Sequence, residues 1–385
     1  DVVMVDTGNS YEGLCEYVGG KYISYTDEHP ITMNPFAIKR EELNIEKIGF
    51  LKNLIMLIWK GTQGEVTKTE DRLVEQVITE YFDEYFVKKR IDNLSFNTFY
   101  EYSTVRIPDI IKENNLAGID LAAYNYLLKD FYKGGSHELT LNENLDTKLF
   151  DETFIVFEID SIKDDPLLFP LVTLIIMDVF IQKMRIKKNR KVLVIEEAWK
   201  AIASPMMAEY IKYLYKTARK FWASVGVVTQ EIQDIVGSPI VKEAIINNSD
   251  VVMLLDQAKF RERFDEIKAI LGLTDVDCKK IFTINRLENK EGRSFFREVF
   301  IRRGSVGAVF GVEEPHECYM TYTTERAEKE ALKLYKKELQ CDHQHAIEAY
   351  CRDWELSGIS KSLPFAQKVN QTGHVLHLTP HNQSE

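Results

Sequence analysis

Short apolar runs that end in polar or acidic residues recur along the chain and predict the strands of a parallel sheet. The first run, Val2–Val5, passes directly into Asp6. Comparable runs occupy Phe154–Asp160, Lys191–Glu197, Ala223–Thr229 and Asp250–Asp256. Nearly continuous apolar character over a short run is typical of strands that are covered on both faces. The polar residues at the strand ends would then gather at the carboxyl edge of the sheet, where open α/β sheets bind ligands.

Helical periodicity fills the intervals between these strands. Leu167–Lys187 and Pro205–Phe221 are the clearest helix candidates, and Ser238–Asn247 is a third. Strands that alternate with helices predict an α/β fold in which helices cover both faces of the sheet.

A long segment without a convincing strand separates the first strand from the others. Glu41–Lys60 predicts a helix that ends at Gly61, and Asn114–Tyr132 has a helical pattern too. Asp71–Arg90 repeats its apolar residues at i, i+1, i+4 and i+5, which indicates an amphipathic helix with a wide apolar face. We expect residues 40–150 to form an all-helical insertion.

The last part of the chain changes character again. Ser294–Arg303 and Ser305–Val312 predict a hairpin across Gly304, and Thr324–Trp354 predicts one charged helix. The expected organisation is a first core part at 1–39, the helical insertion at 40–150, a second core part at 151–323, a C-terminal helix at 324–356 and a flexible tail at 357–385.

Composition places the chain among ordinary soluble globular proteins. Its 385 residues include 49 Lys and Arg against 60 Asp and Glu, which gives a formal charge of -11. This balance argues against a protein that coats nucleic acid non-specifically, although a local basic channel remains compatible with it. Five scattered cysteines favour a reduced, cytosolic protein over a disulfide scaffold.

Neither the longest apolar stretch nor the start of the chain indicates a membrane segment or a signal peptide. The longest apolar stretch, Leu167–Ile181, contains Pro170 and Asp178 and is short for a span. The chain opens on Asp1 instead of Met, and its first apolar run has no charged segment before it. We therefore expect a fragment that begins inside a fold.

The acidic pair Glu196-Glu197 is the most informative feature, because it follows the apolar run Val192–Ile195 directly. The first carboxylate can hold the water shell of Mg²⁺, and the second can orient and deprotonate an attacking water. This is the arrangement of a Walker B motif. The alternative is a strand that ends in two solvated acids.

Polar residues after the next helix and strand extend this hypothesis. Arg219 and Lys220 end a predicted helix, and Gln230 ends the following strand. An arginine at a helix end can reach the γ-phosphate of a neighbouring subunit, and a glutamine can position the nucleophilic water. The alternatives are a cation that complements the helix C-terminus and a polar residue that starts a turn.

Several segments in fixed order then carry a family resemblance. They are Val5–Tyr11, Asn34–Phe36, Phe157–Asp160, Val194–Lys200, Lys216–Phe221, Val228–Glu231 and Asn247–Asp250. Together they strongly resemble the TraG-type ATPases of bacterial conjugation, which belong with the large ATPases of type IV secretion. That group lies in the hexameric RecA-like class that includes FtsK and HerA. The resemblance spans the chain from its first residue to about Trp354.

The resemblance implies a fold, a reaction and roles for single residues. It implies a RecA-like P-loop NTPase sheet and an ATPase that uses Mg²⁺ to drive DNA or protein transfer or apparatus assembly. By motif match, Glu196 is the Mg²⁺-associated acid, Glu197 the catalytic base, Arg219 the arginine finger and Gln230 the sensor glutamine. The wider class commonly has Asp where Glu196 stands, so the longer side chain can displace the metal's water shell.

Two further nucleotide contacts and a set of partners complete this expectation. Asp6 can approach the base or ribose, or form a turn, and Lys220 is a candidate contact to ATP. The resemblance implies a hexameric ring, inner-membrane components of the secretion apparatus as partners, DNA as an optional one, and a cytoplasmic position at the inner membrane.

The phosphate loop of this family does not occur in the printed sequence. The nearest match to G-x-x-x-x-G-K-[ST] is Gly19–Tyr22, which has neither the upstream Gly nor the Ser or Thr. We therefore expect this chain by itself to bind nucleotide weakly or not at all. A non-hydrolysing scaffold of the secretion complex and a metal-dependent hydrolase that uses Glu196 and Glu197 are the alternatives.

Smaller groups of residues have less specific patterns. The basic run of Lys183, Arg185, Lys187, Lys188, Arg190 and Lys191 fits either a contact to an anionic partner or a basic helix end. Cys341, His343, His345 and Cys351 do not have the paired short spacings of a zinc site. Asp160 can support the metal shell or cap the helix that follows it.

Overall fold

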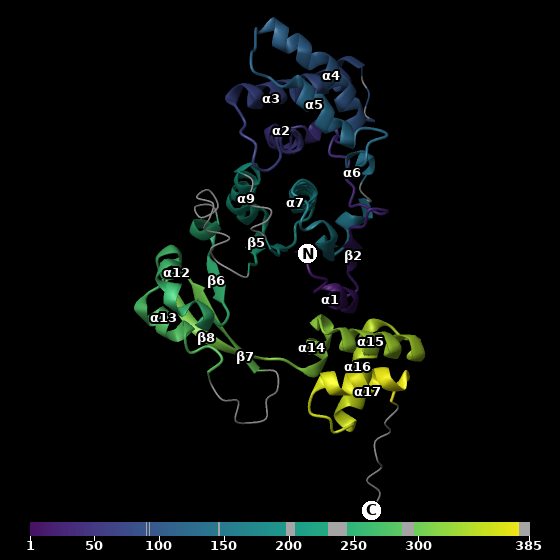
Figure 1. The fold of residues 1–385 in the computed structure, drawn as a ribbon, viewed down its shortest axis with the longest axis vertical. Helices are drawn as coiled ribbons and strands as arrows, with labels where there is room; N and C mark the ends of the chain where they lie inside the picture. The colour runs from purple at the N-terminus through teal and green to yellow at the C-terminus, as the bar shows by residue number, and fades with distance from the viewer. Residues whose placement is uncertain are drawn as a thin grey trace, which may run out of the picture. The chain divides into compact units, whose positions relative to one another are not determined.

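The computed structural model divides the chain into two compact units, and each is described by itself (Figure 1). It describes residues 1–89, 91, 93–144, 147–197, 205–229, 245–286 and 296–376. The core unit comprises Asp1–Thr7 and Ile23–Asn248, and the second unit comprises Gly8–Tyr22 and Ser249–Glu385. This division differs from the expected one, because residues that follow Asn248 leave the core.

The core unit is built on a mainly parallel sheet, as the apolar runs predict. Its strands are β1 (Val2–Asp6), β2 (Lys21–Ser24), β3 (Phe154–Glu158), β4 (Lys191–Ile195) and β5 (Ala223–Val227), in the order β2-β3-β1-β4-β5. β1 pairs in parallel with β3 and β4, and β4 pairs in parallel with β5. Helices α7 (Leu168–Ile186) and α9 (Pro205–Ala218) return the chain from one strand to the next. The α/β fold class is therefore confirmed.

Helix α7 explains the interrupted apolar stretch of the sequence. Nearly all of its residues are buried, as expected for a helix that is apolar on every side. Its one central acid, Asp178, forms an ion pair with Lys47 at 2.9 Å, and both side chains are under 10% exposed. Among the described residues, no helix is long and apolar enough to cross a membrane.

The described residues of the insertion form helices joined by turns and no strand, as predicted. Its helices are α2 (Ile45–Lys60), α3 (Lys68–Phe82) with a π-helical continuation (Asp83–Lys89), α4 (Phe96–Glu113), α5 (Leu121–Leu128) and α6 (Glu138–Asn142). Thr67 and Glu70 form a capping box that starts α3. The expected helix Asn114–Tyr132 is wrong at its start, because Asn114 ends α4 and Asp120 caps α5.

The insertion shares a single apolar core with the sheet. One cluster of buried side chains runs from Val3 and Ile155 on the strands through α7 to the aromatic residues of α3 and α4. Within it, Phe36 stacks on Phe99 with ring centroids 4.8 Å apart. The insertion is thus packed onto the core and is not a separate domain.

Short 3₁₀ segments connect several of these elements. They are η1 (Arg40–Glu42), η3 (Lys129–Phe131), η4 (Thr147–Phe150), η5 (Asp160–Ile162), η6 (Arg219–Phe221), η7 (Ile246–Asn248) and η8 (Ala258–Arg263). The predicted helix Ser238–Asn247 lies mostly outside the described residues, and only its last turn overlaps η7.

The second unit contains a separate three-stranded sheet of β6 (Val251–Leu254), β7 (Phe296–Arg303) and β8 (Val306–Glu313). β6 pairs antiparallel with β7, so the expectation that it continues the parallel sheet is wrong. The hairpin of β7 and β8 is present, and Gly304 takes the positive φ of 58° that its turn needs. Helices α12 (Phe264–Leu271) and α13 (Asp275–Ile281) belong to the same unit.

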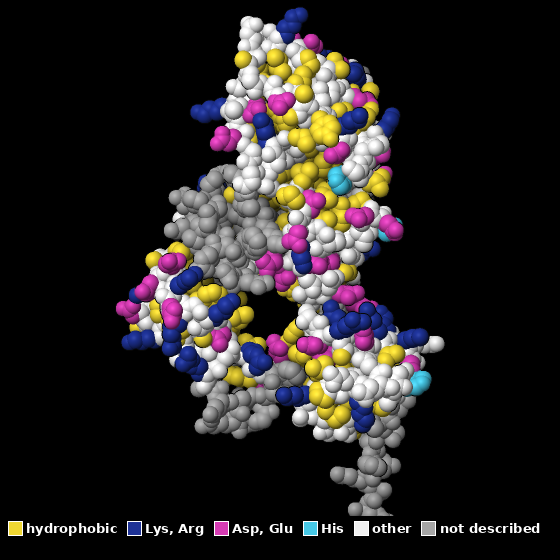
Figure 2. Space-filling view, viewed as in Figure 1, with side chains coloured by type: hydrophobic (Ala, Val, Ile, Leu, Met, Phe, Trp, Pro, Cys, Tyr) yellow, Lys and Arg dark blue, Asp and Glu magenta, His cyan; other side chains and the backbone are white. Residues whose placement is uncertain are grey.

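Five helices form the remainder of the second unit: α1 (Glu12–Tyr17), α14 (His316–Tyr322), α15 (Arg326–Leu339), α16 (His343–Leu356) and α17 (Ser362–Thr372). The single helix expected at 324–356 is wrong, because Gln340 takes a left-handed conformation and Asp342 caps α16. The expected flexible tail is wrong for residues 362–372, where Phe365, Ala366 and Val369 of α17 are fully buried; residues 377–385 lie outside the described residues. Figure 2 shows Lys and Arg side chains gathered over α15. The opposite face of this helix packs into the core of the second unit.

Candidate functional site

Acidic side chains converge at the carboxyl edge of the core sheet. Asp6 is the last residue of β1 and lies in register with Glu158, the last residue of β3. On the other side of β1, Val5 lies in register with Ile195, and the backbone N–H of Glu196 donates to the Val5 carbonyl at 3.1 Å. Since neighbouring strands are about 4.8 Å apart, three adjacent strands bring these acids to one edge.

Two of these acids are almost completely buried. Asp6 is 0% exposed and Glu158 is 3% exposed. One carboxylate oxygen of Glu158, Oε1, accepts the backbone N–H of Asp160 at 2.7 Å, which fixes the turn after β3. Glu158 is a site residue that the motif pattern does not single out, although it ends an apolar strand just as Glu196 follows one.

Glu196 and Glu197 leave β4 in a turn and are half-buried. Glu197 has a φ of 47°, in the left-handed region that non-glycine residues adopt rarely. A strained backbone of this kind persists where the surrounding structure holds it, and such residues concentrate at functional sites. The strand and turn thus place a half-buried carboxylate in a fixed position beside the buried acids.

The next strand ends at the same edge. The N–H of Val228, which follows β5, donates to the Ile195 carbonyl at 2.9 Å, and Thr229 is half-buried. The predicted sensor Gln230 lies outside the described residues.

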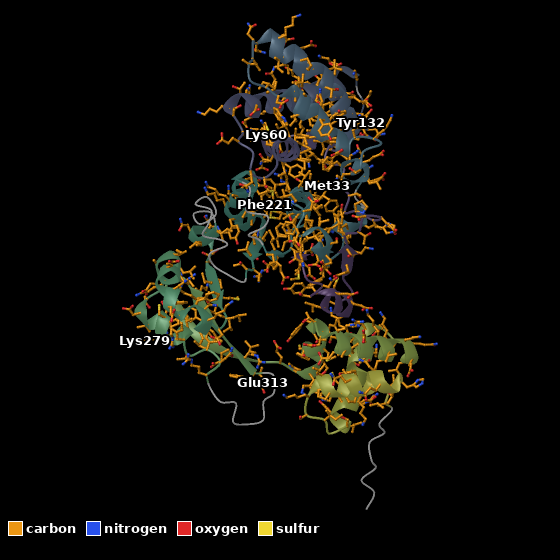
Figure 3. The ribbon with its side chains drawn as sticks, in the orientation of Figure 1. Met33, Lys60, Tyr132, Phe221, Lys279 and Glu313 are labelled. Carbon is orange, nitrogen blue, oxygen red and sulfur yellow. The ribbon has the colours of Figure 1, made fainter. Side chains whose placement is uncertain are left out.

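Arg219 and Lys220 lie at the opposite edge of the sheet. They belong to η6, which directly precedes β5, and Ala223 at the start of β5 is in register with Lys191 at the start of β4. Figure 3 labels Phe221, which ends this segment between α9 and β5. Both cations are exposed. The length of β5 separates them from the acidic edge by about 13 Å along the strand, at about 3.3 Å per residue.

The basic run at 183–191 does not form one exposed surface. Lys183 and Lys191 are buried, Arg185 pairs with Glu46, and Lys187 pairs with Asp151. The ammonium of Lys191 donates to the carbonyls of Asn189 at 2.7 Å and Phe221 at 3.1 Å. This buried lysine holds the segment that carries Arg219.

Comparison with known protein families identifies the family of this chain. Residues 1–354 match the TraG P-loop domain. The chain belongs to the TraG P-loop domain family. The match reaches from the first strand into α16 and ends where the sequence resemblance predicted that it would.

Related proteins and structures agree with this membership. The chain is 23% identical over 285 residues to protein TraC of Escherichia coli strain K12, and the match covers 69% of this chain and 30% of TraC. It thus spans less than a third of that relative. The fold is similar to VirB4 of Thermoanaerobacter pseudethanolicus (TM-score 0.58, 20% identity, 82% of each chain). It is also similar to the unbound bacterial conjugative coupling protein TrwBdeltaN70 (TM-score 0.50, 12% identity, 82% of this chain and 77% of that one). These similarities confirm the RecA-like expectation for the fold.

The acids of this TraG-family chain fit a magnesium ion that is held mainly through water. Among the described residues, no group of three or more His, Cys, Asp or Glu side chains could hold a metal ion by itself. Mg²⁺ commonly keeps several waters and binds through one or two carboxylates together with substrate phosphates. The carboxylates at the acidic edge provide such a partial oxygen donor set.

Other candidates from the sequence have local partners. Asp160 starts η5 and pairs with Lys163 at 2.8 Å. His343 contacts Glu16, and His345 bonds to Asp342. Gly19–Tyr22 leads from α1 into β2, whereas a phosphate loop leads from a strand into a helix. This segment therefore lacks the architecture of a phosphate loop.

Proposed function

We propose that this chain forms the larger part of the ATPase domain of a conjugation or type IV secretion motor. The observation that carries the proposal is the acidic edge of the core sheet, where Glu196 and Glu197 follow β4 beside Asp6 and Glu158. Such an edge is the ligand-binding position of an open α/β sheet, and the TraG P-loop family match identifies the sheet.

The two half-buried acids are given different roles in ATP hydrolysis. We assign Glu197 as the base that orients and deprotonates the attacking water, since the turn after β4 fixes its backbone. Glu196 would hold the water shell of Mg²⁺. Asp6 is completely buried, so it would support the acidic edge from within the sheet and not contact the nucleotide directly. Mg²⁺, when bound, would neutralise charge on the phosphates. Gln230 keeps its proposed role as sensor on the basis of the motif alone.

Arg219 would act on the nucleotide of a neighbouring subunit. It is exposed and lies at the edge of the sheet opposite Glu197, so it cannot reach the nucleotide that its own Glu197 would serve. A finger in trans requires a ring, and we propose a hexamer as the working form. By the same geometry, Lys220 would contact the neighbour's nucleotide and not its own.

The proposal also covers binding partners and the affinity of this chain for ATP. Inner-membrane components of the secretion apparatus are the proposed docking partners, at the cytoplasmic side of the bacterial inner membrane, and DNA or protein is the proposed cargo. The printed residues contain no G-x-x-x-x-G-K-[ST] loop, whose backbone N–H groups would hold the phosphates. We therefore propose that the 385-residue chain alone binds ATP weakly.

The test compares ATPase rates of the complete gene product as wild type, Glu197→Gln and Asp151→Asn. Removal of the catalytic base should lower the rate about 100-fold or more. Asp151 is an exposed acid beside the opposite edge of the sheet, paired with Lys187, and its variant should keep the wild-type rate. Equal rates in wild type and Glu197→Gln would refute the assignment and favour a non-hydrolysing scaffold.

A further inference from the structure

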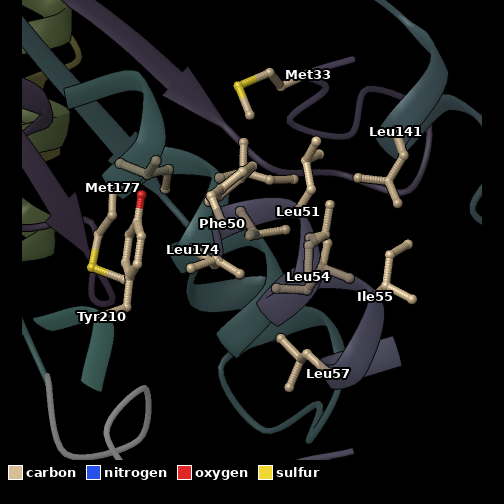
Figure 4. Packing of buried hydrophobic residues seen from close by; sticks show 14 of the residues in the cluster. Met33, Phe50, Leu51, Leu54, Ile55, Leu57, Leu141, Leu174, Met177 and Tyr210 are labelled. Atoms are coloured by element: carbon tan, nitrogen blue, oxygen red, sulfur yellow. The ribbon is translucent and has the colours of Figure 1, made fainter. Parts of the chain in front are cut away.

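A cavity of about 430 Å³ lies in the core unit, away from the acidic edge. The beginning of α2, the second half of α7 and α9 contribute its walls, so it lies where the insertion meets the sheet domain. Figure 4 shows this junction, with Phe50 of α2, Leu174 and Met177 of α7 and Tyr210 of α9 close together. None of the residues assigned to ATP hydrolysis lines it.

The polar groups of the cavity are held in place by hydrogen bonds to Asp178. The Asp178 carboxylate accepts the Lys47 ammonium at 2.9 Å and the Gln182 amide at 2.6 Å, and both bonds end on the same oxygen, Oδ2. The other oxygen of Asp178 has no hydrogen-bond partner among the described residues. A buried carboxylate with an open acceptor position favours a ligand that donates hydrogen bonds.

Tyr210 provides a second open position in the same cavity. Its side chain is 7% exposed and lines the wall, and its hydroxyl has no hydrogen-bond partner among the residues that the structure describes. Burial raises the pKa of Tyr210 well above its ordinary value, and the Asp178 carboxylate raises it further, so the hydroxyl stays protonated. The hydroxyl is not among the fully buried polar atoms without a partner, so it faces space in the cavity that a ligand can reach.

Charge and aromatic surface favour a cation. Four carboxylates but only two cations line the cavity, and each cation, Lys47 and Arg185, is already paired with one of the carboxylates. The other two acids, Glu41 and Glu42 of η1, form no ion pair within the described part of the chain, and Glu42 accepts the backbone N–H of Lys39. The rings of Tyr210 and Tyr213 lie 6.2 Å apart and offer faces that attract a cation.

We propose that this cavity binds an organic cation with a flat or apolar body, an amidinium or guanidinium group in particular. Its N–H groups would donate to the open oxygen of Asp178 and to the Tyr210 oxygen, with its body against the aromatic wall of the cavity. The cation can come from a free small molecule or from an arginine side chain that a partner presents. The proposal does not depend on ATP hydrolysis.

The position of α9 gives such binding a consequence. This helix separates the turn of Glu197 from Arg219, since it begins at Pro205 and ends at Ala218. A ligand held by Tyr210 and Tyr213 would stiffen the connection between the two edges of the sheet.

The test is calorimetric titration of the 385-residue chain with benzamidine, with neutral benzamide and anionic benzoate as matched probes. Benzamidine should bind at least about tenfold more tightly than either, because only it pairs with Asp178. Tyr210→Phe should weaken benzamidine binding about tenfold and leave thermal stability unchanged, because the lost hydroxyl has no partner within the described chain. Nα-acetyl-arginine amide as a fourth probe distinguishes the sources: tighter binding than benzamidine indicates a partner's side chain, and weaker binding a free small molecule.

Tyr124→Phe is the matched control, since it removes another buried hydroxyl from the same core, one that bonds to Ser103 at 3.1 Å. It should lower stability and leave benzamidine binding intact. The proposal is overturned if benzamidine and benzamide bind equally, if benzoate binds more tightly, if neither binds, or if Tyr210→Phe binds benzamidine like wild type.

Discussion

The two edges of the core sheet differ in the charges that they carry. Asp6, Glu158, Glu196 and Glu197 gather at the carboxyl edge, whereas Lys183, Lys191, Arg219 and Lys220 lie at or near the amino edge. Each edge combines buried charges that hold the backbone with more accessible charges that can meet a ligand. The difference shows that residues of one motif series can lie at two separate edges of a single sheet.

The topology of a parallel sheet produces this separation. A chain that leaves the carboxyl end of β4 must return to the amino end of β5 before it can form the next parallel strand. Helix α9 makes this return, so Glu197 precedes the helix at one edge and Arg219 follows it at the other. Within one subunit, no side-chain rotation closes a gap of about 13 Å plus the turn.

The largest expected effect comes from Arg219→Ala in the complete gene product. Loss of a charge that stabilises the transition state should lower the ATPase rate about 10³-fold. If the finger acts in trans, mixing this variant with the impaired Glu197→Gln variant should restore part of the activity. In mixed rings, some interfaces combine a wild-type Glu197 with a wild-type Arg219 from the neighbour.

The control mixes the double variant, Arg219→Ala with Glu197→Gln, with either single variant. No interface in these rings combines both wild-type residues, so the mixture should stay inactive. A mixture of the single variants that shows no more activity than either alone would contradict action in trans and would break the comparison between the two edges.

A smaller effect separates the buried from the exposed cations of the amino edge. Lys191→Met should lower the free energy of unfolding by about 1 kcal/mol, because the partly buried hydrogen bonds to the carbonyls of Asn189 and Phe221 lose their donor. Lys220 is exposed and lies in η6, at the same edge of the sheet. Lys220→Ala should change the free energy of unfolding by less than about 0.5 kcal/mol. Urea denaturation measures both, and similar values for the two variants would show that burial does not divide these cations.

The smallest expected effect is a dependence on alkaline pH. Burial lowers the pKa of Lys183, nearby Lys187 lowers it further, and Glu152 and Asp151 oppose the change. Lys183 also contacts Asp1 and donates to the carbonyls of Phe150 and Glu152. The unfolded chain keeps this proton up to about pH 10.4, so stability rises with pH between the lowered folded pKa and that value.

The measurement is the difference in unfolding free energy between wild type and Lys183→Met from about pH 8 to pH 10. The difference should grow in favour of wild type as pH rises, because only wild type can release this proton on folding. A constant difference would show that the Lys183 ammonium is held at this edge without any cost from burial.

The sequence predicted the elements whose pattern is local. The apolar runs located β1 and β3–β5, the capping residues Thr67 and Glu70 begin α3, and Gly304 lies at the predicted hairpin turn. The prediction failed where distant contacts decide. α17 packs Phe365 and Val369 into the second unit, but its surrounding polar residues resemble a solvated tail. β6 has the apolar run of a parallel strand, but its pairing partner is β7.

For the site, the sequence by itself identified the family and predicted which residues would carry chemistry, namely the acidic pair after β4 and the arginine after α9. Only the tertiary structure decided that Asp6 and Glu158 join the acids, and that Arg219 lies at the other edge. The physical reason is that strand-end motifs depend on neighbours along the chain, whereas strand order and helix return are set by which apolar faces pack together.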